Sequence, residues 1–161
     1  MEYSREKVFE LLAQVKDPEI PVLSVIDMGI VRDVEVNSSQ GSVRVSITPT
    51  YSGCPAMKMI EDDIVQVLRE AGVASVSVDT VLAPAWTTDW LTAEAKEKLR
   101  QYGIAPPKSP VVTLGREKLI VACPFCASKK TERRSDFGST PCKTFYFCRE
   151  CEQPFEYFKA I

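Results

Sequence analysis

Four cysteines near the C-terminal end of the chain have a spacing that suits a metal ion. The sequence reads C-P-F-C from Cys123 and C-R-E-C from Cys148, with 21 residues between Cys126 and Cys148. Two residues between paired cysteines let one tight turn aim both sulfurs at one ion, and two such turns supply a tetrahedron. The interval is one residue longer than is usual for this pattern. Cys123, Cys126, Cys148 and Cys151 are therefore predicted to form one four-thiolate site, with structural zinc favoured over iron.

The segment that carries these cysteines is too short to fold on hydrophobic burial alone. In small zinc modules the metal contributes on the order of 10 kcal/mol to folding. The alternation around Phe145 and Phe147 and the run from Phe155 to Phe158 predict two ribbon strands. The aromatic residues of this segment are interpreted as a small core over the metal rather than as a platform for stacking bases. These residues are Phe125, Phe137, Phe145, Tyr146, Phe147, Phe155, Tyr157 and Phe158.

Cys142 is left over from the two pairs, six residues before Cys148. Three interpretations stay open for it: a buried small apolar residue, an exposed thiol, or an additional metal ligand. Lys143 beside it would lower the pKa of the thiol if both side chains were exposed.

Cys54 is the lone cysteine of the first two thirds of the chain. Gly53 allows a sharp turn, and Pro55 suits the first position of a helix. Cys54 is therefore predicted at the N-cap, where backbone N–H groups favour a thiolate that attacks or binds metal. The alternative is a cysteine that only packs, and the residues alone do not decide between the two.

Three acidic residues in connecting segments could join such a site. Asp17, Glu19 and Asp27 are candidate ligands that would hold a metal transiently together with Cys54. Their composition favours turns, at Asp17-Pro18-Glu19 and at Asp27-Met28-Gly29. The chain has no histidine, so no histidine base is present to activate a nucleophile. We therefore do not expect this chain to be an enzyme by itself.

The elements that position these residues follow from hydrophobic periodicity. Helices are predicted over 4–15, after Pro55 as far as Gly72, and over 88–101. Strands are predicted around Val34, from Val43 to Ile47 and from Val76 to Leu82, the first two as a hairpin. The predicted fold class is α+β, a small αββαβ sandwich followed by a zinc-ribbon-like β module. The predicted domains are residues 1–103, a proline-rich linker and strand over 104–120, and the four-cysteine module over 121–161.

Composition and charge bound the function. The chain has 161 residues, a net charge of -2 and six cysteines. It has no run of about 20 apolar residues and no signal-peptide pattern, so a cytoplasmic protein with reduced thiols is expected, without a membrane partner. Residues 104–161 are net positive and residues 1–103 net negative. A basic patch at Lys129, Lys130, Arg133 and Arg134 leaves nucleic-acid binding as a disfavoured alternative, given a pI of 5.3.

The motifs in order resemble a known family. Asp17-Pro18-Glu19, Asp27-Met28-Gly29-Ile30-Val31 and Gly53-Cys54-Pro55 are similar to the pattern of SufT-like iron–sulfur cluster assembly domains. In that family the cysteine of the G-C-P loop is regarded as the functional residue. With the C-terminal motifs added, which include F-G-S-T-P-C-K from Phe137 to Lys143, the whole chain resembles the PaaD (also called PaaJ) subunits of phenylacetyl-CoA epoxidase systems.

The resemblance implies an accessory subunit that assists assembly of an iron or iron–sulfur centre in phenylacetate catabolism. The implied partners are the oxygenase and the reductase subunits of the epoxidase. The implied cofactors are zinc in the four-cysteine module and transient iron or an iron–sulfur cluster at Cys54. Cys142 lies inside a motif of that family, which weakens its interpretation as a packing residue only. A purely structural subunit of the same complex is the main alternative.

Overall fold

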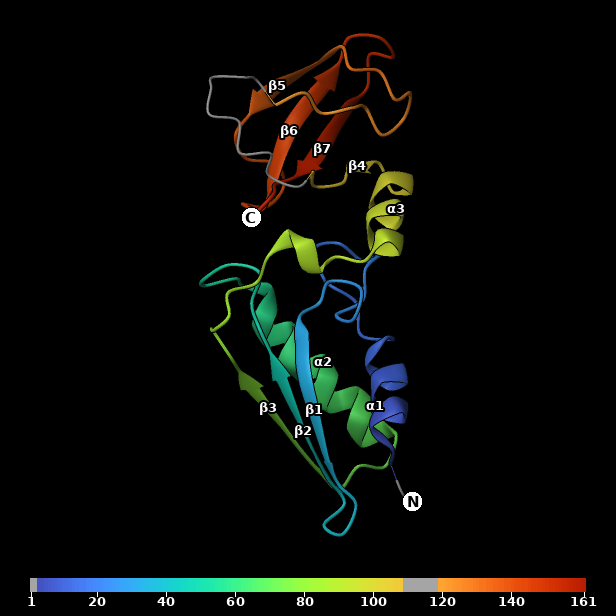
Figure 1. Ribbon diagram of the computed structural model, residues 1–161, viewed down its shortest axis with the longest axis vertical. Coiled ribbons are helices and arrows are strands. Elements are labelled where there is room, and N and C mark those ends of the chain that lie inside the picture. The colour runs from blue at the N-terminus through green and yellow to red at the C-terminus, as the bar shows by residue number, and fades with distance from the viewer. Residues whose placement is uncertain (1–2, 109–118) are drawn as a thin grey trace. The chain divides into compact units, whose positions relative to one another are not determined.

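The computed structural model describes residues 3–108 and 119–161 (Figure 1). The chain divides into two compact units, Met1–Thr92 and Ala93–Ile161. We call these the N-terminal unit and the C-terminal unit. Each has its own sheet, with three strands in the first and four in the second. Among the described residues, no helix combines the length and the apolar character needed to cross a membrane.

Helix α1 (Arg5–Leu12) opens the N-terminal unit. The Ser4 side chain accepts a hydrogen bond from the backbone N–H of Lys7 and so caps the helix. Val8 and Leu12 are fully buried, in keeping with their spacing of four residues along one helix face. The helix ends before the predicted Val15, because the chain turns toward Asp17-Pro18.

The sheet of the N-terminal unit has the order β1-β2-β3. Strands β1 (Val31–Asn37) and β2 (Ser42–Ile47) form the predicted antiparallel hairpin, and Val34 lies opposite Val45. Strand β3 (Ser75–Thr80) pairs parallel to β2, with Ile47 opposite Thr80. A parallel neighbour requires a crossover connection. Helix α2 (Ala56–Glu70) supplies it, so the αββαβ order and the α+β class are confirmed.

Helix α2 packs its apolar face against the sheet. Ile60, Ile64 and Leu68 have no exposed surface, and they recur at helical spacing. Val43, Val45 and Ile47 of β2 are buried in the same way. Burial of each such side chain contributes about 2 kcal/mol. This packing fixes the start of α2, and with it the loop that carries Cys54.

Residues 81–92 follow β3 and complete the N-terminal unit; we call this segment the strap. It contains a 3-10 turn, η1 (Thr88–Trp90), where the sequence predicts the start of a longer helix. Trp86, Thr88 and Leu91 are buried. The predicted helix over 88–101 is therefore correct only in its second part, because the chain leaves helical geometry at Leu91 (φ -66, ψ 129).

The C-terminal unit begins with helix α3 (Ala93–Gln101) and the two-residue strand β4 (Ile104–Ala105). Strands β5 (Thr131–Ser135), β6 (Lys143–Cys148) and β7 (Pro154–Phe158) complete a sheet of order β4-β7-β6-β5. The predicted ribbon strands are β6 and β7, and they pair antiparallel. Strand β4 pairs parallel to β7, which attaches the residues just after α3 to the ribbon.

The unit boundary between Thr92 and Ala93 lies before α3, whereas the sequence places α3 in the first domain. The predicted linker and strand over 104–120 fall partly on residues 109–118, which lie outside the described residues. In the part that is described, Ile104 and Ala105 form a short strand of the ribbon sheet and are buried.

Candidate functional site

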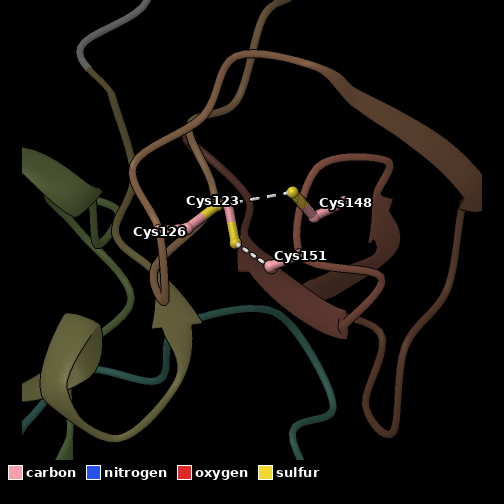
Figure 2. Close-up of side chains that lie close together, drawn as sticks. All are labelled: Cys123, Cys126, Cys148 and Cys151. Atoms are coloured by element: carbon pink, nitrogen blue, oxygen red, sulfur yellow. Dashed lines mark hydrogen bonds between the residues drawn. The ribbon is translucent and has the colours of Figure 1, made fainter.

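The four predicted cysteines of the C-terminal unit come together (Figure 2). The Sγ atoms of Cys123 and Cys151 lie 3.6 Å apart, as do those of Cys126 and Cys148. All four Sγ atoms lie within 4.8 Å of one another. Cys123 and Cys148 are buried, whereas Cys126 is exposed. The site therefore lies at the surface of the unit, with half of its sulfurs inside.

The two turns that present these sulfurs are built alike. The residue after the second cysteine of each pair, Ala127 and Glu152, has a left-handed backbone with φ near 60° (60° and 57°). In the first turn the backbone N–H of Ala127 donates to the Cys123 carbonyl, and in the second that of Cys148 donates to the Gln153 carbonyl. Each turn thus folds back on itself and directs two thiols the same way.

The donor set fits a single tetrahedral ion. Sulfurs placed 2.3 Å from a zinc ion at the corners of a tetrahedron are separated by about 3.8 Å. The two closest sulfur pairs, at 3.6 Å, are near this edge length. Of the described cysteine, aspartate and glutamate side chains, these four form the one group of three or more that could hold an ion.

Hydrogen bonds and burial shift the pKa values of three of these thiols in different directions. Hydrogen bonds from the backbone of Cys151 and then Glu150 lower the pKa of the Cys148 thiol to about 7. Burial raises the pKa of Cys151 to about 12, and burial also raises the pKa of Cys123. The turn around Cys148 thus supplies N–H groups that stabilise a thiolate there.

The aromatic residues behind the site form a core. Tyr146 stacks on Phe155 with ring centroids 5.7 Å apart and meets Tyr157 edge-on at 6.0 Å. Both Cys123 and Cys148 belong to the same buried cluster. These rings therefore form the predicted small core, beside the four cysteines, whereas Phe125 and Phe137 are more than half exposed.

Cys142 is buried and lies outside the four-cysteine group. Its Sγ lies 3.0 Å from the Thr140 hydroxyl. Lys143 is only 3% exposed, and its Nζ lies 3.0 Å from a carboxylate oxygen of Glu156. The condition under which Lys143 would lower the pKa of this thiol, exposure of both side chains, is therefore not met.

Cys54 lies in the loop of residues 48–55 that joins β2 to α2, and we call this segment the Cys54 loop. Its thiol is partly exposed. The helix is assigned from Ala56 with Pro55 at the N-cap, so the prediction that Cys54 is the N-cap is wrong by one residue. Pro55 itself has helical dihedral angles (φ -68, ψ -21), and no side chain caps this helix end. Cys54 remains beside this helix end.

The three acidic candidates are engaged in turns. Asp17 is buried, and its Oδ1 accepts hydrogen bonds from the backbone N–H groups of Glu19 and Ile20, each at 2.8 Å. The carboxylate of Asp27 accepts one from the backbone N–H of Ser24. Glu19 is half-buried. The structure does not bring Cys54 and these carboxylates together as a group that could hold an ion.

The basic residues near β5 are paired with acidic ones. Lys130 pairs with Glu150, and Arg133 with Asp136. Arg134 and Arg149 both contact Glu132. Paired cations offer less positive charge to a phosphate backbone than free ones do, so this surface adds no support to the nucleic-acid alternative.

Sequence reasoning did not anticipate two features of these sites. The strap contacts the turn at Asp27-Met28-Gly29, with the indole N–H of Trp86 donating to the Met28 carbonyl. The ion pair of buried Lys143 with partly exposed Glu156 spans β6 and β7. For the strap, the sequence offered one sign: two tryptophans in a short segment without helical or strand periodicity.

Two family models match the chain. The family described as iron–sulfur cluster assembly protein matches residues 5–80, and the PaaD zinc β-ribbon domain matches residues 107–159. A domain of unknown function from Bacillus anthracis is 28% identical with a TM-score of 0.54, and it covers 58% of this chain and 89% of its own. A conserved hypothetical protein from Thermotoga maritima is 31% identical with a TM-score of 0.53, over 61% of this chain and 95% of its own.

Curated relatives extend these matches. An Fe-S protein maturation auxiliary factor from Porphyromonas gingivalis is 36% identical over 60% of this chain and 90% of its own length. An Escherichia coli K12 protein, whose name provisionally assigns it to 1,2-phenylacetyl-CoA epoxidase as one of its subunits, is 47% identical over 96% of this chain and 92% of its own length. The chain therefore belongs to the PaaD family, in which an iron–sulfur cluster assembly domain is joined to a zinc β-ribbon.

Proposed function

We propose that this chain is a non-catalytic maturation factor that assists assembly of an iron or iron–sulfur centre in a phenylacetyl-CoA epoxidase system, in the cytoplasm. Cys54 holds iron or a cluster briefly, and the four-cysteine module binds zinc and docks the client subunit. The clients are the oxygenase, the reductase or both. Asp17, Glu19 and Asp27 remain predicted additional donors, but the proposal rests on the Cys54 thiol.

The observation that carries the proposal is the position of Cys54. It lies in the connection between β2 and α2, at the carboxyl end of the parallel pair β2 and β3. Ligands of open α/β sheets bind at such ends, beside helix N-termini. The thiol is partly exposed, so it can exchange an ion with a partner. Relatives named as maturation auxiliary factors, matched over 60% of this chain, support the same role.

Zinc is the metal that the four-cysteine module is proposed to hold. The chemistry of the donor set supports this, because closed four-thiolate sites are most often structural zinc. Bound zinc would neutralise charge on the four thiolates and tie the two turns together. The chain's own contribution is the pair of left-handed turns and the aromatic core behind Cys123 and Cys148.

The test replaces Cys54 with Ser in the full chain, which is co-expressed with the oxygenase and reductase subunits. Iron in the purified partners is expected to fall, while zinc in the variant stays at the wild-type level. Cys142→Ala is the matched control, since it removes a cysteine outside both sites. Full iron loading of both partners with the Cys54→Ser chain would contradict the proposal.

A purely structural subunit is the second candidate, and the exposed aromatic residues of the C-terminal unit favour it. Phe125 is 55% exposed and Phe137 is 65% exposed, and exposed aromatic side chains are enriched where proteins meet. If the chain is purely structural, Cys54→Ser leaves iron in the partners unchanged, whereas Phe137→Ser weakens the complex so that its subunits no longer copurify. Copurification of the complex with both variants would exclude it.

A further inference from the structure

The Cys54 loop begins where Ile47, the last residue of β2, is followed by Thr48, and we call these two residues the stem. The stem is hydrogen-bonded to two other segments of the N-terminal unit. The backbone N–H of Thr48 donates to the Ile30 carbonyl at 2.9 Å. The backbone N–H of Val81, the first residue of the strap, donates to the Ile47 carbonyl at 2.7 Å. Thr48 is 1% exposed. The direction in which the loop leaves the sheet is thus set by the turn that ends at Ile30 and by the strap.

The strap also holds that turn. The indole Nε1–H of Trp86 donates to the Met28 carbonyl at 2.7 Å, in a buried environment. Trp90 lies against Gly29, where a β-carbon would come within 3.0 Å of the Trp90 Cβ and 3.2 Å of its carbonyl oxygen. The Arg32 guanidinium covers the Trp90 ring at 3.6 Å. The two tryptophans therefore hold residues 28–32 in place through these contacts.

The backbone hydrogen bonds next to Cys54 are long. The backbone N–H of Cys54 donates to the Tyr51 carbonyl at 3.3 Å, and that of Met57 donates to the Cys54 carbonyl at 3.3 Å. Both distances exceed the usual range for such bonds. A β-carbon at Gly53 would have no heavy atom within 4 Å. The position of the thiol therefore depends on the two ends of the loop, which are the start of α2 and the stem at Thr48.

We propose that Trp86 and Trp90 are positioning residues for Cys54. They act through the chain of contacts from the strap to Met28-Gly29, then from Ile30 to Thr48, and so to the loop. This inference rests on the proposed function for its biological purpose, but the positioning itself concerns only this chain. The match to the iron–sulfur assembly family ends at residue 80, so the strap adds an element outside that match.

The test measures the alkylation rate of Cys54 by iodoacetamide in the full chain, with zinc in the four-cysteine module and no iron added. Trypsin releases residues 45–58, between Arg44 and Lys58, as a peptide with Cys54 as its one cysteine. Trp86→Phe keeps an aromatic ring, although a smaller one, and removes the donor to the Met28 carbonyl. Cys54 is expected to react about fivefold faster, the change in an opening equilibrium that loss of one ordinary hydrogen bond produces. The Thr48 amide is expected to exchange faster with deuterium as well.

Tyr3→Phe is the matched control. It removes an aromatic hydroxyl that donates to the Ala71 carbonyl, at the opposite end of α2. This variant is expected to lose stability without a change in Cys54 alkylation. If Trp86→Phe leaves the alkylation rate and the Thr48 amide unchanged, or if Tyr3→Phe changes them equally, the positioning role is wrong. Trp90→Leu, at a partly exposed ring, takes the place of Trp86→Phe if that variant does not fold, with the same expected result.

Iron loading of the coexpressed partners separates this inference from the proposed function. If both are correct, Trp86→Phe lowers iron in the partners as Cys54→Ser does, but to a smaller extent. If Cys54→Ser leaves iron unchanged while Trp86→Phe still accelerates alkylation, the maturation role fails and the positioning role stands. The reverse pattern, with Cys54→Ser impaired and Trp86→Phe equal to wild type in both measurements, overturns only the positioning role.

Discussion

The ring of Phe125 lies against Gly103, where a β-carbon would come within 3.0 Å of two ring carbons. Phe125 belongs to the turn that carries Cys123 and Cys126, whereas Gly103 ends α3. Ala105, two residues later, is 2% exposed in the same buried cluster as Cys123 and Cys148. The residues around α3 are thus joined to the four-cysteine site through a ring, a strand and a core.

Metal removal is therefore expected to unfold more than the two turns. A chelator with a reductant should abolish protection from hydrogen exchange in β6 and β7, and also in α3 and β4, because their common core depends on the site. Amides of α2 and β2 in the N-terminal unit should keep their protection. Peptide-level hydrogen exchange of the full chain measures both. Retention of protected α3 and β4 after complete metal removal would contradict this coupling.

A substitution at Gly103 tests the same contact without chelation. Gly103 has φ +91, so alanine there strains the backbone and also displaces the Phe125 ring. Gly103→Ala is expected to destabilise the C-terminal unit by roughly 2 kcal/mol and to weaken zinc retention against a competing chelator. Gly53→Ala is the control for backbone strain alone, because its β-carbon meets no neighbour. It should leave zinc retention unchanged.

Metal analysis tests the ligand assignment. Wild-type protein is expected to bind one zinc ion per chain. Cys148→Ser should lose it, because a neutral hydroxyl is a much weaker zinc ligand than a thiolate and the closed four-thiolate site is broken. Cys54→Ser and Cys142→Ala should keep it, since neither residue belongs to the group of four. Loss of zinc in the Cys142→Ala variant with an intact fold would assign a ligand role to Cys142.

The sequence predicted those parts of the molecule whose periodicity reflects a single buried face. Ile60, Ile64 and Leu68 identify α2, and the alternation from Val43 to Ile47 identifies β2, because burial of one face imposes these intervals. The cysteine spacing predicted the four-sulfur group for a related reason: two short turns aimed at one point need little information from the rest of the fold.

Other features depend on long-range contacts that leave no periodic pattern. Strand β4 has two residues, and its pairing with β7 cannot be inferred from Ile104 and Ala105 alone. Strand β5 is charged and mostly exposed, so its residues Arg133 and Arg134 resemble a solvated basic patch. The role of the strap likewise depends on the contact of Trp86 with Met28, 58 residues apart in sequence. Propensity and pattern do not specify such contacts.

Asp17 offers a prediction that separates a turn residue from a metal ligand. Its Oδ1 accepts from two backbone N–H groups, so Asp17→Ala should destabilise the N-terminal unit by about 1–2 kcal/mol. Asp17→Asn keeps an oxygen acceptor and should stay close to wild type in stability and in iron delivery. Hydrogen exchange of the Ile20 amide and iron in the coexpressed partners are the measurements. If the Asn variant folds normally but fails to deliver iron, the carboxylate charge acts at the metal.

The ion pair of buried Lys143 with partly exposed Glu156 should stabilise the C-terminal unit in a pH-dependent way. Glu156→Gln leaves the Lys143 ammonium, 3% exposed, without its counterion. Breaking a buried pair from one side costs about 3 kcal/mol. Native-state hydrogen exchange at Lys159, whose amide donates to the Cys142 carbonyl, reports the stability of this region. Lys143→Met with Glu156→Gln removes both charges and should recover most of the loss.

The sign of the pH effect follows from the pKa of Glu156. Burial raises this pKa, but hydrogen bonds from the Ser139 backbone and from Lys143 outweigh burial and hold it below its ordinary value of 4.5. A carboxyl with a lowered pKa in the folded state contributes stability that is present above the unfolded value and is lost as pH falls through the folded one. The stability difference between wild type and Glu156→Gln, measured with the same zinc content, should therefore shrink below pH 4.5. A difference that stays constant across this range would show that the negative charge of Glu156 does not hold Lys143 in place.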